Sequence, residues 1–343
     1  MKNLLVCAPQ LDDVTSFWRC AGPLNALKHP GWNIMYVPDR HRFDWTDISQ
    51  VDAIFMQRPS TDQHVHLLDM AKAMNRKVWV EYDDDLTSIP YSNDANPFYN
   101  QTQIQKNLSH IAKHASVVSV TTERLKQRMQ NQGAQDVRVI PNAWNDNLFP
   151  FYDIDKKRFN YLKASKVSKA HAKKFIMWRG SKSHNEDLDT HLGELRKIHD
   201  NHKDYHFLFV GHFSYRVREV IDKERLMWLD PMSIVNYHGF LKDMTIEATF
   251  VPLVDNTFNR CKSNIAWQEA TYNGSSCVAP DFEEWRFNGC GLYDPEKKNL
   301  AEVFGNVLES RDQMQKDSIE SIMEHRLLSK VNNLRKEILD GLA

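Results

Sequence analysis

The chain has 343 residues, and its 41% hydrophobic content is enough for two hydrophobic cores. Its 44 basic and 45 acidic residues leave a formal net charge of −1, so overall charge gives no reason to expect binding to nucleic acid or to an anionic membrane. Its five cysteines are widely spaced and include no C-x-x-C pair, which argues against a disulfide scaffold and against a zinc site.

The N-terminal segment reads MKNLLVCAPQ, and its apolar run is too short for a signal peptide or a membrane span. We therefore expect the mature protein to begin at Met1 and to have no transmembrane segment. The unpaired cysteines fit a reducing compartment, so we expect a cytoplasmic protein, located in the host cytoplasm if it is viral.

Short apolar runs alternate with amphipathic stretches through the first half of the chain, which predicts strands alternating with helices. The strands are predicted at 4–8, 33–37, 53–57, 78–81, 117–120 and 137–140. Helices are predicted between them, for example at 64–74 and at 122–132, where Gly133 provides a C-cap. This alternation is typical of an α/β domain with an open parallel sheet, to which we assign residues 1–155.

The alternation stops at 156–174, a stretch with eight lysines and arginines that we interpret as a basic linker. It then resumes, with strands predicted at 175–178, 206–210, 234–238, 248–252 and 276–279 and helices at 186–199 and 263–272. We predict a second Rossmann-like, doubly wound domain over 175–320. The charged tail is predicted to be helical, and a C-terminal helix at about 325–343 can pack back on the first domain.

Two such domains that face one another leave a cleft at the carboxyl ends of their strands, where ligands bind. Within 251–280, Arg260 and Lys262 flank the start of a helix that Ser263 and Asn264 can cap. Two cations and a helix N-terminus at one place predict a diphosphate site. Glu269 lies roughly 9 Å further along the helix, about the step from a diphosphate to its ribose. The alternative is an ordinary capped helix with surface charges.

A second motif follows the predicted strand at 175–178. The strand leads into Arg179, Gly180 and Ser181, and Lys182 comes next. Gly180 lets the backbone approach a ligand, while Arg179 and Lys182 add positive charge. We therefore include these four residues in the predicted binding site.

The residues after this motif predict the start of a helix. Ser183 and Glu186 match the S-x-x-E capping box. His184 and Asp187 lie in the same stretch, and a purely structural role is at least as open for them as a functional one.

Three consecutive carboxylates, Asp83, Asp84 and Asp85, follow the predicted strand at 78–81 and so fall at the ligand-binding edge of the first sheet. Neighbouring carboxylates repel one another unless a cation, hydroxyls or N–H groups offset the repulsion. They are candidates for binding a substrate hydroxyl or for acting as a general base, and a Mg²⁺ site is also open. The alternative is one helix cap and two solvent-exposed side chains.

The segment around Glu269 resembles the GT-B glycosyltransferases, which bind nucleotide-sugars between two Rossmann-like domains, and in particular the retaining family-four (glycosyltransferase group 1) enzymes. The matching features are the helix with Glu269, the turn at 273–274 and the strand at 276–279. The resemblance implies that Glu269 binds the donor ribose. The family pattern has two glutamates in this segment, and Cys261 stands at the first of the two positions.

Weaker features of the resemblance occur in the family's order over roughly residues 1–300. Related enzymes carry an acidic run after an Arg-Pro pair like Arg58–Pro59. Gly211 and His212 follow a strand of the second domain, as does Gly239, where the resemblance places the nucleobase.

The resemblance implies transfer of a sugar from a nucleoside-diphosphate sugar, with UDP favoured, to a hydroxyl of a glycan or a lipid-linked glycan with retention of configuration. No tightly bound cofactor is expected, and a divalent metal is not required in this class. The residues predicted to be catalytic are Asp83, Asp84, Asp85 and Arg179.

Three alternatives stay open. A viral enzyme that glycosylates hydroxymethylated cytosine in DNA would hold the DNA backbone with the basic stretch Lys156–Lys174 and its aromatic residues. A non-catalytic nucleotide-sugar sensor would be consistent with Cys261 at a position where the family has a carboxylate. An epimerase with the same two-domain architecture would need no acceptor.

Overall fold

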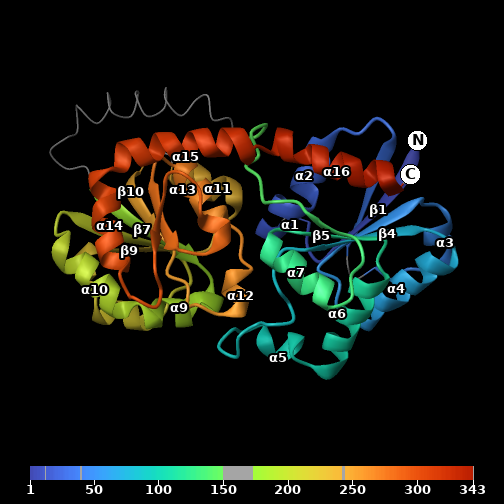
Figure 1. Cartoon of the computed structure of the whole chain (residues 1–343), viewed down its shortest axis with the longest axis horizontal. Coiled ribbons are helices and arrows are strands. Elements are labelled where there is room, and N and C mark those ends of the chain that lie inside the picture. Colours follow the sequence, from blue (N-terminus) through green and yellow to red (C-terminus); the bar gives the residue numbers. More distant parts are fainter. Residues whose placement is uncertain (12, 39–40, 150–172, 242–243, 343) are drawn as a thin grey trace.

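The structure, a computed structural model, describes residues 1–343 except 12, 39–40, 150–172, 242–243 and 343. These residues form two six-stranded sheets, each flanked by helices (Figure 1). The strand order is β2-β1-β3-β4-β5-β6 in the first sheet and β12-β11-β10-β7-β8-β9 in the second. Neighbouring strands run parallel in both sheets, as the predicted α/β class requires.

The first half of the chain carries the first sheet. Its strands are β1 (Lys2–Ala8), β2 (Trp32–Pro38), β3 (Ala53–Gln57), β4 (Lys77–Tyr82), β5 (Val117–Val120) and β6 (Val137–Val139). Its helices are α1 (Val14–Arg19), α2 (Ala21–Leu27), α3 (Trp45–Ser49), α4 (Asp62–Ala73), α5 (Asn96–Tyr99), α6 (Thr102–His114) and α7 (Glu123–Asn131).

The second half carries the second sheet. Its strands are β7 (Lys174–Gly180), β8 (Tyr205–Gly211), β9 (Leu226–Leu229), β10 (Thr245–Phe250), β11 (Ser276–Pro280) and β12 (Cys290–Tyr293). Its helices are α9 (Asn185–Thr190), α10 (Leu192–Asn201), α11 (Ile234–Leu241), α12 (Thr257–Arg260), α13 (Ile265–Tyr272), α14 (Leu300–Glu309) and α15 (Arg311–His325), and α16 (Leu328–Leu342) follows.

Both sheets bury side chains on their two faces, which explains why the strands read as unbroken apolar runs. In β1, Leu5 and Cys7 belong to one core cluster, whereas Leu4 and Val6 belong to another on the opposite face. Strand β7 shows the same alternation, because its successive residues enter two separate clusters of the second half.

The C-terminal helices pass from one half to the other along one side of the molecule, and both termini lie beside the first sheet (Figure 1). Helix α15 packs against α13 and α14, whereas α16 packs against α2. The crossing point is held at Trp144, whose N–H donates to the carbonyl of Arg326 at 2.7 Å and whose carbonyl accepts from the N–H of Leu328 at 2.8 Å. The last helix is therefore part of the core of the first half.

The structure corrects two of the predicted elements. The predicted strand at 234–238 is helix α11, which buries Tyr237, His238 and Leu241 on one face and leaves Val235 61% exposed. A short apolar run fits a strand and a buried helix turn equally well, which explains the error. The predicted helix at 186–199 is two helices, α9 and α10, which meet at His191.

Candidate active site between the two sheets

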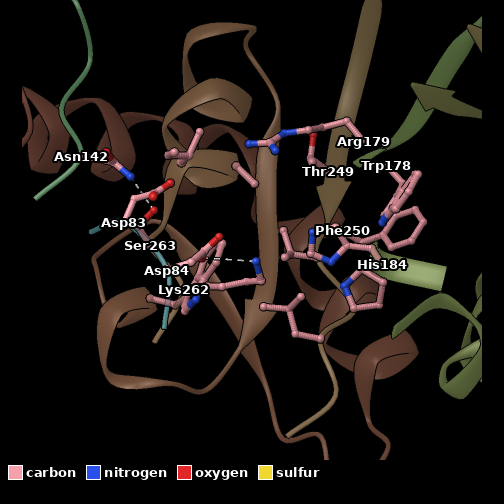
Figure 2. Close-up of a pocket in the computed structure, with 16 residues that line it drawn as sticks. Asp83, Asp84, Asn142, Trp178, Arg179, His184, Thr249, Phe250, Lys262 and Ser263 are labelled. Carbon is pink, nitrogen blue, oxygen red and sulfur yellow. Dashed lines mark hydrogen bonds and ion pairs between the residues drawn. The ribbon is translucent and has the colours of Figure 1, made fainter. Parts of the chain in front are cut away.

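A cleft lies between the two halves, at the carboxyl ends of strands from both sheets. It holds a small cavity of about 160 Å³ and, beside it, a large cavity of about 500 Å³. Asp84 from the first half and Lys262 from the second line both cavities. Figure 2 shows the small cavity, whose polar lining residues are Asp83, Asp84, Asn142, Arg179, His184, Thr249, Lys262 and Ser263.

Hydrogen bonds between the halves fix the second sheet's α13 relative to the first sheet. The Asn142 amide donates to the Ser263 hydroxyl at 2.6 Å, and the Gln268 amide donates to the Asn142 carbonyl at 3.0 Å. The Thr122 hydroxyl donates to the Cys261 carbonyl at 3.1 Å. Because Asn142 and Gln268 are almost fully buried, breaking these bonds would leave buried polar atoms unpaired.

Cys261 lies outside the cleft. Its side chain is fully buried and belongs to the core cluster of the first half. Burial raises the pKa of the thiol to about 12, and the charge of Asp85 adds to the rise, so the thiol is neutral. Cys261, where the resemblance implies a glutamate, therefore packs against the core of the first half and lines neither cavity.

Arg179 connects the small cavity to Glu269. Its guanidinium lies at the end of β7, lines the cavity and is 2.7 Å from the Glu269 carboxylate. Glu269 is only 3% exposed and is not among the residues that line either cavity. Burial raises the pKa of Glu269, and Arg179 partly offsets the rise. The structure thus brings Arg179 to the cavity and keeps Glu269 paired behind it.

Lys262 and Arg260 point to different places, although only Cys261 separates them in the sequence. Lys262 lies 3.5 Å from Asp84 across the cleft and 4.4 Å from the centre of the Phe258 ring. Arg260 ends helix α12, pairs with Asp255 at 2.5 Å and lines neither cavity. In the structure, therefore, only Lys262 of the two predicted cations lines the described cavities, while Asp255 holds Arg260 elsewhere.

Asp83 and Asp84 face the cleft with a shared arginine. Arg58 forms a two-pronged ion pair with Asp83 and donates to Asp84 at 3.3 Å. Burial acts to raise the pKa of Asp84, but Lys262 and Arg58 outweigh it and hold this pKa below its ordinary value. Arg58 also has a φ of 50°, a left-handed conformation that is costly for a side chain with a Cβ and is enriched at functional sites.

Asp85 has a structural role. It is fully buried and lines neither cavity. Its carboxylate accepts hydrogen bonds from Arg128 at 2.7 Å, from the Thr87 N–H at 3.1 Å and from the Ser88 hydroxyl at 2.7 Å. The structure therefore separates the third carboxylate from the two that face the cleft.

One glycine lets the ends of β7 and β8 approach one another. Gly211 has a φ of 99°, and a Cβ on it would lie 2.0 Å from the Gly180 carbonyl oxygen. The N–H of His212 donates to the same oxygen at 3.1 Å. Ser181, Lys182 and His212 line the large cavity.

The predicted helix caps do not form. Helix α9 begins at Asn185 without a side-chain cap, while Ser183 bonds to Ser181 at 2.6 Å and Glu186 accepts from Ser92 of the first half. Asn264 occupies the N-cap position of α13, but its amide donates to the Glu284 carbonyl at 3.0 Å instead of capping the helix. The Ser263 hydroxyl accepts from Asn142, as described above. Contacts with distant residues thus replace the local caps.

Several residues that line the cavities were not among the predicted site residues, and His184, Asn142 and Arg58 are three of them. His184 lines the small cavity with its imidazole beside Asp187, and the i, i+3 spacing of these two residues was a usable signal. Asn142 belongs to the Pro-Asn pair that follows the last strand of the first sheet. Arg58 lies at the end of β3, next to the acidic run in space but 25 residues from it in sequence.

The basic stretch Lys156–Lys174 lies outside the described residues, apart from its last two lysines. Among the described residues, no group of three or more histidine, cysteine, aspartate or glutamate side chains is arranged to hold a metal ion. In the same part of the chain, no helix has the length and apolar character needed to cross a membrane.

No model of a known protein family matches the chain, and no curated protein matches it. Among solved structures, it is similar to a glycosyltransferase from Rickettsia africae, with a TM-score of 0.68, 14% identity and coverage of 99% of this chain and 98% of that one. A UDP-forming α,α-trehalose-phosphate synthase from Burkholderia xenovorans gives a TM-score of 0.66 at 13% identity, over 100% and 99% of the two chains. The UDP-GlcNAc 2-epimerase from Neisseria meningitidis, bound to UDP-GlcNAc, gives a TM-score of 0.58 at 12% identity, with coverage of 99% of each chain. These similarities, together with the two parallel sheets, show that the chain has the GT-B fold predicted from its sequence.

Proposed function

We propose that this protein is a glycosyltransferase that moves a sugar from a UDP-sugar to an acceptor hydroxyl. The observation that carries the proposal is the small cavity, where Arg179 and Lys262 from the second half face Asp83 and Asp84 from the first. Cations beside a helix N-terminus suit a diphosphate, and carboxylates opposite them suit hydroxyl groups. The fold relatives support UDP as the nucleotide, since one forms UDP and another is bound to UDP-GlcNAc.

In this proposal the donor diphosphate lies between Arg179, Lys262 and the first N–H groups of α13. A helix leaves these N–H groups without intrahelical partners, so they are available to an anion. Negative charge grows on the diphosphate as the glycosidic bond breaks, and fixed cations stabilise it without reorganising. In this proposal Arg179 turns from Glu269 to the diphosphate, which leaves the Glu269 carboxylate to accept the ribose hydroxyls. Gly180 and Gly211 present no side chain to the nucleotide.

The acceptor is proposed to enter through the large cavity. Its lining mixes polar groups, such as Asn93, Asp94 and His212, with the aromatic rings of Tyr99 and Phe258. Such a surface suits a hydroxyl-rich glycan, because rings pack against sugar C–H groups while the polar atoms bind hydroxyls.

Asp84 is proposed to bind the attacking hydroxyl, because it lines both cavities. Its lowered pKa keeps the carboxylate ionised and able to accept a hydrogen bond from that hydroxyl. We further propose that attack occurs on the face of the sugar from which the diphosphate leaves, with retention of configuration. A glycan or lipid-linked glycan is the proposed acceptor.

An epimerase is the second candidate, since the Neisseria epimerase shares the fold over nearly the whole chain. The two reactions differ in their need for an acceptor, because an epimerase converts a nucleotide-sugar without one. The large cavity beside the small one favours transfer, since it offers room for a second substrate.

The test has two steps. A thermal-shift screen with UDP, GDP, ADP and CMP and their sugars should show stabilisation of several degrees by UDP or a UDP-sugar, because a ligand that binds only the folded state raises the melting temperature. The stabilising UDP-sugar is then incubated with and without a panel of glycan acceptors, and products are identified by mass spectrometry and NMR. Acceptor-dependent release of UDP supports the transferase, an acceptor-independent change of the sugar supports the epimerase, and binding without turnover supports a sensor. No stabilisation by any nucleotide would refute the donor site.

A further inference from the structure

His184 is a histidine of the small cavity that none of the predicted roles uses. It ends the 3-10 turn Lys182–His184 that follows β7, and its imidazole lines the cavity on the same side as Arg179 and Phe250 (Figure 2). The side chain remains 24% exposed, although it lies between the two halves of the protein. Its ring is therefore within reach of whatever fills the cavity.

A buried carboxylate fixes the orientation of this ring. The Nδ1 atom of His184 lies 2.8 Å from an Asp187 carboxylate oxygen. The other oxygen of Asp187 accepts from the Val254 N–H at 2.8 Å and from the Asn259 amide at 2.9 Å. Three donors hold this carboxylate, which is 7% exposed, in place, and because a carboxylate oxygen only accepts hydrogen bonds, His184 presents an Nδ1–H to it.

The second ring nitrogen is left for a ligand. With Nδ1 protonated, Nε2 of a neutral imidazole carries a lone pair, and no residue in the described part of the chain hydrogen-bonds to it. Burial lowers the pKa of His184, and Lys262 and Arg179 lower it further, against the opposite effect of Asp187. The unliganded imidazole is therefore neutral at pH 7.

Four charged groups act on this imidazole, each from a different element. Asp187 belongs to α9, Arg179 to the end of β7, Lys262 to the connection between α12 and α13, and Asp84 to the segment after β4 of the first half. The two cations are the groups that a diphosphate would neutralise. Once an anion lies between them, the repulsion that keeps the imidazole unprotonated disappears and an attraction to the anion replaces it.

We propose that His184 is a further ligand of the donor diphosphate and that it takes up a proton when the nucleotide binds. This inference rests on the proposed donor site. A proton from solvent adds to the Nε2 lone pair, and the resulting N–H donates to a phosphate oxygen while Nδ1–H stays on Asp187. The bound state gains one positive charge, and donor binding becomes stronger as the pH falls.

The test measures proton uptake by isothermal titration calorimetry of the full chain with UDP at pH 7.5, in Hepes and in Tris, whose ionisation enthalpies differ. UDP itself titrates, so the quantity of interest is the difference between the wild type and His184→Gln. We expect the wild type to take up more protons than His184→Gln, by up to about one per UDP bound. As the pH rises through the range of that uptake, the dissociation constant of UDP from the wild type should rise by up to about tenfold per pH unit. Loss of the charged hydrogen bond should weaken UDP binding by about ten- to a hundredfold in His184→Gln at pH 6.5.

His206→Gln is the matched control. His206 lies near the amino end of β8, at the opposite edge of the second sheet from the cleft, and burial lowers its pKa as well. This variant should show the proton uptake of the wild type. Circular dichroism melts check that both variants fold. Because UDP titrates in the same way with either protein, the difference in the pH dependence of UDP binding between the two variants isolates the contribution of His184.

The outcomes separate this inference from the donor site itself. Equal proton uptake and equal pH dependence in the wild type and in His184→Gln, with UDP still bound, would overturn the role of His184 alone. Absence of UDP binding to the wild type at every pH would overturn both proposals. Proton uptake that depends on His184 but not on His206 would support both.

Discussion

Replacing Lys262 with alanine should weaken UDP binding, and its neighbour Arg260 offers a matched comparison. Lys262 lines both cavities and is 18% exposed, whereas Arg260 lines neither. A hydrogen bond to a charged group contributes about 1.5–3 kcal/mol, which corresponds to about ten- to a hundredfold in a dissociation constant. Because Lys262 already pairs with Asp84 at 3.5 Å, a ligand must compete with that carboxylate. We therefore expect a loss close to tenfold for Lys262→Ala.

Arg260→Ala should leave the dissociation constant of UDP within about twofold of the wild type. Its side chain is 35% exposed and pairs with Asp255, and such surface pairs contribute about 0–1 kcal/mol to stability. Calorimetric titration of UDP into both variants, after circular dichroism confirms their folding, makes the comparison. An equal loss in the two variants, or a larger one in Arg260→Ala, would refute the assignment of the diphosphate to the small cavity.

Three further substitutions test other parts of the structure. Gly211→Ala should destabilise the protein by about 2–4 kcal/mol, because the φ of Gly211 is 99° and the new Cβ would meet the Gly180 carbonyl oxygen. Gly193→Ala should not destabilise it, because nothing lies within 4 Å of the new Cβ. Urea unfolding compares the two variants, and similar losses of stability would contradict the close approach of β7 and β8. Cys261→Glu introduces the carboxylate that the sequence resemblance implies at this position. It should lower the free energy of unfolding by several kcal/mol because the site is fully buried, and a stable variant with improved turnover would show that this position faces the substrate after all. Burial raises the pKa of Glu284 from 4.5 to about 7, so the folded state binds more protons than the unfolded state in this range and the free energy of unfolding falls as the pH rises through it. Glu284→Gln should remove this contribution, and wild-type and variant urea melts with parallel pH dependence would argue against it.

Most strands could be predicted because a parallel sheet covered on both faces requires unbroken apolar runs. The predicted runs at 53–57 and 117–120 coincide with β3 and β5. Strands β9 and β12 were missed. They form the two edges of the second sheet, β9 has no fully buried residue, and β12 contains a glycine. The run at 234–238 also contains β-branched and aromatic residues but folds as α11, so its environment decides between strand and helix.

The place of the site followed from topology, whereas the directions of its side chains did not. Residues after parallel strands meet at one edge, which is why Arg179 and Asp84 could be predicted near a common cleft. Whether Arg260 or Asp85 joins them depends on partners such as Asp255 and Arg128, which hold them elsewhere. Such pairings between loop residues leave no periodic signal in a sequence.

The crossing at Trp144 has a consequence for the way in which the cleft can change its width. Backbone hydrogen bonds join Trp144 to Arg326 and Leu328, where the chain returns from α15 to α16. A connection that is bonded in this way cannot lengthen or swing freely, so the two halves keep their spacing at this point. A change in the width of the cleft then requires one half to turn about this point relative to the other. The separation of Asp84 and Lys262 reports that turn, and a pair of probes on the outer surfaces of the two halves would follow it.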